Sequence, residues 1–166
     1  MIVIVIMGVV YTLAVGNFKT LKDSVNTLSL GNLKEYLQSF KHTKSVELLC
    51  LDDCSSCKVL VDGTEDNETV SIDDFIDKSI KVYRYNFYLG VQDEEPKVYF
   101  NNKEVEERVC FSYKLNKKGI GDQVLVKYKN KIYDFSNYIG PTPEYNSMQE
   151  LIDYKETLSQ EVLDDF

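Results

Sequence analysis

The sequence has no basic stripe. Its 166 residues include 19 lysine and arginine side chains against 27 aspartate and glutamate side chains, which gives a formal net charge of −8. The lysines alternate with acidic residues, whereas phosphate binding needs basic side chains gathered on one face. The composition therefore argues against a nucleic-acid partner, and we interpret the acidic balance as a source of solubility.

Cysteine and histidine, the usual ligands of structural zinc, are also few. Structural zinc sites usually use two separated pairs of ligands, and the chain has only one C-x-x-C pair, Cys54 and Cys57. The single histidine, His42, follows a predicted helix, and we interpret it as a solvated loop residue in preference to a metal ligand or an acid–base group. We therefore expect neither a metal nor a cofactor.

The N-terminus has no apolar run long enough to cross a bilayer. Residues 1–14 (MIVIVIMGVVYTLA) are apolar and uncharged, but the run stops at about 16 residues, and a spanning helix needs about 20. The small residues Ala14-Val15-Gly16 follow, so the pattern predicts a secretory signal peptide over residues 1–16, although the usual basic start is missing. A buried β-strand and an uncleaved membrane anchor are the alternatives. After cleavage we expect no stable membrane insertion.

A secretory route changes the interpretation of the cysteines and of one asparagine. It predicts that the protein is secreted or resides in the lumen of the endoplasmic reticulum, where four cysteines can form up to two disulfides. The polar segment 62–68 contains Asn67, which begins an N-x-T sequon, and this predicts a glycosylated surface loop.

The remaining composition, 43% hydrophobic and 28% charged, suits one globular domain. We place it at residues 17–158, followed by an acidic tail at residues 159–166. Hydrophobic periodicity predicts helices at residues 29–40 (capped by Ser29 or Asn32), 71–78 and 145–158. It predicts strands at residues 18–21, 46–51 and 80–89, loops at 90–96 and 114–122, and hairpins at 97–113 and 123–135.

Three of the four cysteines lie within residues 45–58, SVELLCLDDCSSCK, where an apolar strand runs into C-x-x-C. In a redox interpretation, Cys54 is the exposed nucleophile at a helix N-terminus, and Cys57 resolves the mixed disulfide. In the competing interpretation, the cysteines form two ordinary structural disulfides.

The second half of the chain resembles a known family. Residues 117–140, followed by the helix at 148–154, resemble the C-terminal half of a thioredoxin domain of the protein disulfide isomerase type. Upstream, residues 18–21, 30–40 and 46–51 are similar to that fold's first strand, first helix and central strand. The resemblance implies an α/β fold, a mixed sheet flanked by helices with an extra β-hairpin insertion. It also implies thiol–disulfide exchange through Cys54 and Cys57, or non-catalytic binding of protein clients.

Two more site assignments come from this resemblance. The family's cis-proline, which packs against the disulfide and docks the substrate backbone, corresponds to about Gln123, and Pro96 is the competing candidate. In a thioredoxin sheet Cys50 and Cys110 would lie on adjacent strands, which makes them candidates for a disulfide if their Cα atoms are within about 7 Å.

The alternative hypothesis is a mostly-β secreted domain, stapled by disulfides, that binds a protein ligand and has no enzymatic activity. Twelve tyrosines are compatible with an interface, although a sheet core explains them too. The state of Cys54 separates the hypotheses. Exchange needs Cys54 exposed at a helix N-terminus, whereas burial of either cysteine in apolar packing, or a bond from Cys54 to Cys110, excludes the enzyme.

Overall fold

The computed structural model describes residues 28–64, 71–101, 103–138 and 140–164. The predicted signal peptide at residues 1–16, the predicted strand at 18–21 and the sequon at Asn67 lie outside these ranges.

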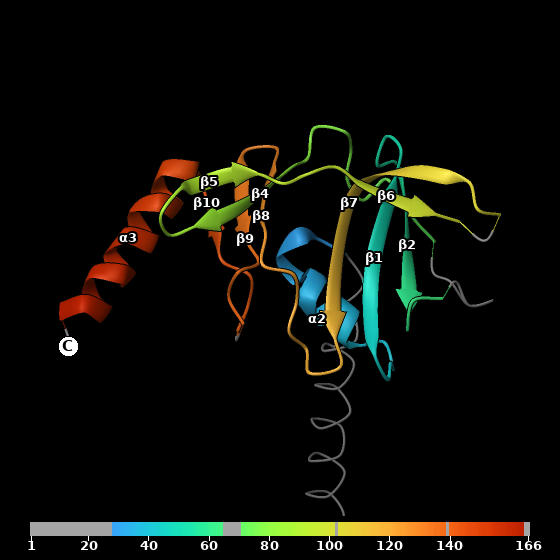
Figure 1. The fold of residues 1–166 in the computed structure, drawn as a ribbon, viewed down its shortest axis with the longest axis horizontal. Helices are drawn as coiled ribbons and strands as arrows, with labels where there is room; N and C mark the ends of the chain where they lie inside the picture. Colours follow the sequence, from blue (N-terminus) through green and yellow to red (C-terminus); the bar gives the residue numbers. More distant parts are fainter. Residues whose placement is uncertain (1–27, 65–70, 102, 139, 165–166) are drawn as a thin grey trace, which may run out of the picture.

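The described residues form two antiparallel sheets of five strands each (Figure 1). In order of hydrogen bonding, the first sheet contains β3 (Ser71–Asp73), β2 (Ser56–Val61), β1 (Ser45–Leu51), β7 (Glu106–Asn116) and β6 (Lys97–Phe100). The second contains β10 (Glu144–Tyr145), β9 (Lys131–Asp134), β8 (Leu125–Tyr128), β4 (Lys81–Asn86) and β5 (Gly90–Asp93). The chain passes from the second sheet to the first between β5 and β6, and it returns after β7.

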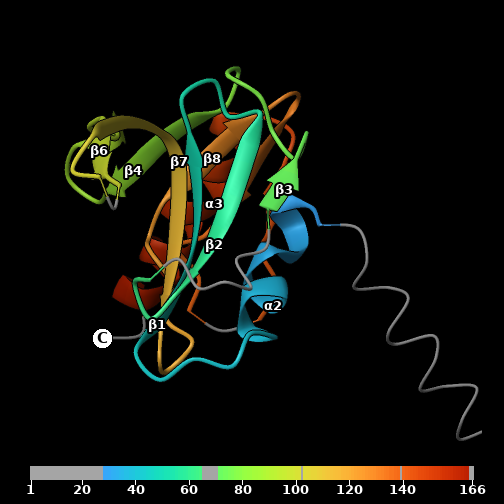
Figure 2. The same ribbon diagram turned by 90° about the vertical axis from the view of Figure 1, so that its right-hand side faces the viewer.

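The sheets form layers with a helix behind them. Figure 2 shows the first sheet in front, the second sheet behind it and α3 (Met148–Asp164) behind the second sheet. The period-two alternation of β8 explains how the second sheet serves two cores. Val126 faces the main core that both sheets share, whereas Leu125 faces a second cluster that contains Leu151 of α3.

A short helical segment closes the main core. It begins with η1 (Leu30–Asn32) and continues as α2 (Leu33–Gln38), whose Leu33 and Leu37 are fully buried. Ser29 is the N-cap, because its hydroxyl oxygen accepts the Asn32 N–H at 3.3 Å and its own N–H donates to the Asn32 side chain at 2.8 Å. This reciprocal capping satisfies two N–H groups that a helix start leaves open. The predicted helix and its cap at Ser29 are confirmed.

The prediction of an α/β, thioredoxin-like mixed sheet was wrong. That fold needs parallel strands joined by helical crossovers, but β1 turns back at once into β2, its antiparallel neighbour. The chain reverses through Asp52 and Cys54, whose φ angles of 53° and 67° lie in the left-handed region. A helix cannot begin there, so the cysteines end a hairpin turn. The alternative prediction, a mostly-β domain, agrees with the fold.

Several local predictions were also wrong, for physical reasons. The helix predicted at residues 71–78 is β3 followed by a loop, because Asp74 has a left-handed φ of 56° and Ile72 packs against the main core. The loop predicted at residues 90–96 contains the edge strand β5. The strand at 46–51 and the hairpins β6–β7 and β8–β9 are confirmed, although β7 continues to Asn116 and α3 continues to Asp164.

Candidate functional site

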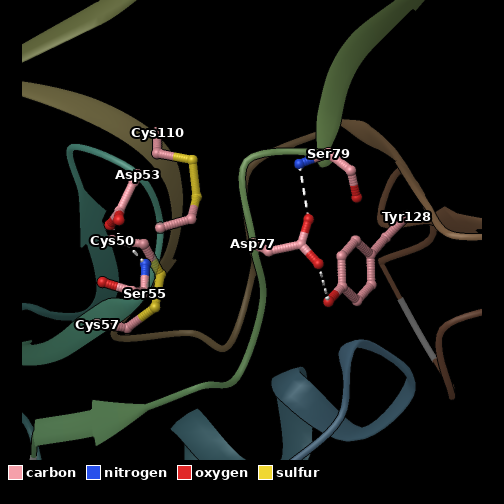
Figure 3. Close-up of a disulfide and its surroundings, with 9 residues drawn as sticks. Cys50, Asp53, Ser55, Cys57, Asp77, Ser79, Cys110 and Tyr128 are labelled. Atoms are coloured by element: carbon pink, nitrogen blue, oxygen red, sulfur yellow. Dashed lines mark hydrogen bonds between the residues drawn. A yellow bond between two sulfur atoms is a disulfide. The ribbon is translucent and has the colours of Figure 1, made fainter.

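The four cysteines form two disulfides at the end of the β1–β2 hairpin (Figure 3). Cys50 and Cys57 lie directly opposite each other on the two strands, with their Cα atoms 4.0 Å apart, and they are bonded. Cys54, in the turn, is bonded to Cys110 of β7, with a Cα separation of 5.6 Å. The first bond closes the hairpin, and the second ties its turn to the neighbouring strand.

Local hydrogen bonds hold this turn in its left-handed conformation. The N–H of Cys54 donates to the carbonyl oxygen of Leu51 at 2.9 Å, and the N–H of Ser55 donates to a carboxylate oxygen of Asp53 at 3.1 Å. Hydrogen bonds from Ser55, first from its side chain and then from its backbone, lower the pKa of Asp53. The carboxylate therefore stays ionised and caps the turn.

This arrangement does not support thiol–disulfide exchange. A catalytic cysteine must be exposed so that its thiolate can attack, but Cys54 and Cys57 are 0% and 1% exposed. Cys54 lies in a turn and is bonded to Cys110, the pairing expected of a structural disulfide and not of an exchange site. Cys50 and Cys110 are both disulfide-bonded, but each to another partner, so the pairing that the thioredoxin resemblance implied is not formed.

The other predicted site residues lie apart from one another. Gln123 is exposed just before β8, and Pro96 is exposed just before β6. The described residues contain no cis peptide bond, so neither position provides the family's cis-proline. His42 lies in the loop before β1, at the opposite end of that strand from the cysteines, and its Nδ1 is 2.8 Å from the carbonyl oxygen of Phe40. In the described ranges no three His, Cys, Asp or Glu side chains converge to hold a metal ion.

Pro96 and Cys110 share the wall of a cavity of about 210 Å³ where the two sheets meet. Apolar side chains from both sheets line it, together with the carboxylate of Glu94. The guanidinium of Arg84 hydrogen-bonds that carboxylate and lowers the pKa of Glu94, and the Lys97 ammonium lies 3.8 Å away. Because its charge is already compensated, Glu94 is not poised to act as an acid or base.

Three successive large apolar residues in the turn between β4 and β5 are exposed, and two of them, Tyr88 and Leu89, are the most exposed large apolar residues of the described ranges. Phe87, Tyr88 and Leu89 are 58%, 89% and 68% exposed. We name this segment, residues 87–89, the hairpin tip. Large apolar side chains that stay in water lose the free energy that burial would give, about 1.5 to 3 kcal/mol each. Three in succession are therefore a candidate contact surface.

The hairpin tip is held in one conformation. The side-chain oxygen of Asn86 accepts the N–H groups of Tyr88 at 2.8 Å and Leu89 at 3.1 Å, and the rings of Phe87 and Tyr88 meet edge to face with centroids 5.4 Å apart. Asn86 pairs across the hairpin with Gly90, whose φ of 71° is in the left-handed region that glycine adopts without cost. The backbone of this turn is therefore shaped by its own hydrogen bonds and not by a partner.

Sequence reasoning missed the hairpin tip because residues 80–89 were assigned to one continuous strand. The signal was present in Asn86-Phe87-Tyr88-Leu89-Gly90, in which three successive apolar residues break the period-two alternation before a glycine. A separate exposed apolar group, formed by Val98, Phe100 and Val105, lies on the β6–β7 hairpin of the other sheet.

No protein-family model, curated protein sequence or solved structure matches the chain. In the ranges that the structure describes, no helix is long and apolar enough to cross a membrane.

Proposed function

We propose that the protein is a disulfide-stapled protein-binding module of an oxidising compartment, either outside the cell or in the lumen of the endoplasmic reticulum, and that it acts by binding and not by thiol chemistry. The observation that carries this proposal is the hairpin tip. Tyrosine and other aromatic residues dominate binding energy at protein interfaces, where a few anchors account for most of it. Phe87 and Tyr88 are aromatic side chains that contact each other and are exposed to solvent.

The rest of the fold supports the same proposal. Both disulfides lie in the first sheet, whereas the hairpin tip belongs to the second. Disulfides persist in oxidising compartments and are rare where glutathione keeps thiols reduced. The apolar residues 1–14 are compatible with a secretory route. In this proposal the two disulfides stabilise the scaffold, and the hairpin tip contacts the protein ligand.

The test is a binding screen of the purified protein against an array of extracellular and lumenal proteins. We expect at least one saturable ligand, and Tyr88→Ser with Leu89→Ser should weaken its binding by about tenfold or more, as loss of an anchor does. The matched control is Val98→Ser with Phe100→Ser, which removes a similar exposed apolar surface from the other sheet and should leave the affinity unchanged. The proposal fails if no array protein binds saturably.

A parallel assay separates binding from catalysis. The wild-type protein should not accelerate reduction of a disulfide substrate by glutathione, because Cys54 and Cys57 are buried. Turnover that is lost in Cys54→Ser and Cys57→Ser variants would contradict the proposal.

A further inference from the structure

α3 packs against the β4–β5 hairpin that carries the hairpin tip. Tyr85, two residues before Phe87, packs with Leu125 and Leu151 in the cluster under α3, and its ring centroid is 5.9 Å from the ammonium of Lys155. Figure 1 shows the turn between β4 and β5 on the side of the sheet where α3 lies.

Beyond that contact, α3 presents another exposed apolar residue. Leu158 follows Lys155 by three residues and therefore lies on the same side of the helix. It is 40% exposed, whereas Leu151, one turn before Lys155, is fully buried. The apolar stripe of α3 thus continues past the buried cluster and into solvent.

The exposed charge of this surface is negative. The sequence of α3 contains one basic residue, Lys155, and this ammonium is held 2.6 Å from the buried carboxylate of Asp134. The exposed acidic side chains of α3 are Glu150, Asp153, Glu156 and Glu161. On the β4–β5 hairpin, Arg84 is engaged by Glu94, and Asp93 is exposed. The exposed charge of the β4–β5 hairpin and of α3 is therefore mainly negative.

Charge is segregated along the second sheet. Lys127, Lys129 and Lys131 are in or beside the β8–β9 turn. Lys81, the first residue of β4, pairs with Lys127, whereas the hairpin tip follows the last residue of that strand. The basic turn and the acidic, apolar surface thus lie at opposite ends of β4.

We propose that the hairpin tip and the exposed side of α3 form one docking surface for a cationic protein segment, in which apolar side chains accompany lysine or arginine. This inference rests on the proposed function and names the partner's chemistry. Complementary charge steers such a segment to the surface and excludes acidic competitors, while the hairpin tip supplies the anchor. The same carboxylates disfavour an anionic membrane surface, because like charges repel.

The probe is a random peptide library displayed on phage and selected on the folded, oxidised protein. Selected peptides should be enriched in lysine and arginine next to aromatic or aliphatic residues. Synthetic copies should lose about tenfold in affinity between low salt and about 0.5 M salt, because mobile ions screen exposed charges. Neutral or acidic selected peptides, or affinities that do not depend on salt, overturn the proposal.

Matched variants locate the surface. Tyr88→Ser with Leu89→Ser should reduce peptide affinity by about tenfold or more. Asp93→Asn on the same hairpin, with Glu161→Gln three residues after Leu158 on α3, should reduce both the affinity and its salt dependence. Glu104→Gln with Glu106→Gln removes two exposed carboxylates at the other hairpin and should change neither. The charge variants do not disturb a packed residue, so they keep the test valid if the hairpin-tip variant folds poorly.

Other results would overturn the docking surface, the cationic partner or the proposed function, and they can be told apart. Peptides that respond to Val98→Ser with Phe100→Ser and not to the hairpin-tip variant overturn this docking surface but leave the proposed function standing. Binding of the hairpin tip to phosphatidylcholine or phosphatidylserine vesicles, or a dimer in analytical ultracentrifugation that the hairpin-tip variant abolishes, overturns the cationic protein partner. If no peptide and no array protein binds, the proposed function fails as well.

Discussion

The ammonium group of Lys155 lies 2.6 Å from the carboxylate of Asp134, and this ion pair joins α3 to the last residue of β9. The Asp134 side chain is 1% exposed and the Lys155 side chain 14%, so water does little to stabilise either charge. The same ammonium donates to the hydroxyl oxygen of Ser136 at 2.6 Å, and that hydroxyl donates to Asp134 at 2.5 Å. Removal of one partner would therefore leave a buried charge uncompensated.

We predict that Lys155→Met destabilises the protein by about 3 kcal/mol, because it leaves the Asp134 carboxylate buried without its cation. Urea denaturation measures this free energy of unfolding. Adding Asp134→Asn should recover much of the loss, since the charge that needed compensation is removed. Lys114→Ala is the control. Its partner is Glu47 at 3.4 Å and its side chain is 48% exposed, so its cost should stay below about 1 kcal/mol. Equal losses for the two lysine variants would contradict the argument.

The two disulfides should contribute unequally. Cys54–Cys110 spans 56 residues of sequence and Cys50–Cys57 spans 7. A cross-link stabilises mainly by restricting the unfolded chain, and the restriction grows with loop length. Replacing Cys54 and Cys110 by serine should therefore cost about 4 kcal/mol, whereas the Cys50 and Cys57 pair should cost about 2 kcal/mol. Denaturation of the two double variants without reductant measures the difference, and the reverse order would contradict the chain-entropy explanation.

The carboxylate of Asp62 should make stability depend on pH in the acid range. The Thr43 hydroxyl donates to it at 2.7 Å, and the N–H groups of Lys44 and Ser45 donate at 2.6 and 3.0 Å. These hydrogen bonds, the Thr43 hydroxyl first, hold the pKa of Asp62 well below its usual value. A depressed folded-state pKa contributes stability above the unfolded-state value of about 3.9, and the contribution is lost as the pH falls through the folded-state pKa.

Asp62→Asn should consequently flatten the loss of stability below about pH 4. Asparagine suits the left-handed φ of 56° at this position, so the backbone conformation is kept while the titrating group is removed. The measurement is the free energy of unfolding of both proteins, from urea denaturation at a series of pH values between about 6 and 2. The two curves should diverge where the wild-type carboxylate titrates. Asp93→Asn, at an exposed site on β5, is the control. Parallel curves for wild type and Asp62→Asn would exclude this role.

Local patterns in the sequence predicted much of the fold. Residues 46–51 form a nearly continuous apolar run, which is typical of a strand buried on both faces, and β1 is that strand. Ser29 with Asn32 is a capping arrangement that depends on nearby residues alone. The β8–β9 hairpin follows from its alternation and its short turn. In each case neighbours in sequence determine the structure.

The partner of each strand could not be predicted in the same way. Whether β1 continues into a helix or turns back depends on left-handed φ angles at Asp52 and Cys54, two residues for which that conformation is uncommon. The bond from Cys54 to Cys110 and the register of β7 make the turn favourable, and they involve residues distant in sequence. The hairpin tip was missed for a related reason: apolar residues predict burial unless the turn that exposes them is known.

The hydroxyl of Tyr113 lies against Gly121 in the main core. Tyr113 is fully buried between the sheets, its ring centroid is 4.5 Å from that of Phe135, and burial raises its pKa. Among the described residues its hydroxyl has no hydrogen-bond partner. A Cβ atom on Gly121 would overlap that hydroxyl and would lie 2.9 Å from Cδ2 of Leu115. Glycine is therefore required here by close packing.

Gly121→Ala should cost about 1 to 3 kcal/mol, because the added methyl overpacks the core. Tyr113→Phe should be neutral or slightly stabilising, since it removes a buried polar group without breaking a hydrogen bond. The double variant should recover part of the Gly121→Ala loss, because the methyl gains the space of the missing hydroxyl; urea denaturation of all four proteins gives this coupling energy. A loss above about 1 kcal/mol for Tyr113→Phe alone would mean that the hydroxyl does make a stabilising hydrogen bond. Strictly additive losses would mean that the ring carbon Cζ of residue 113, at 2.5 Å, or Leu115, and not the hydroxyl, sets the limit at Gly121.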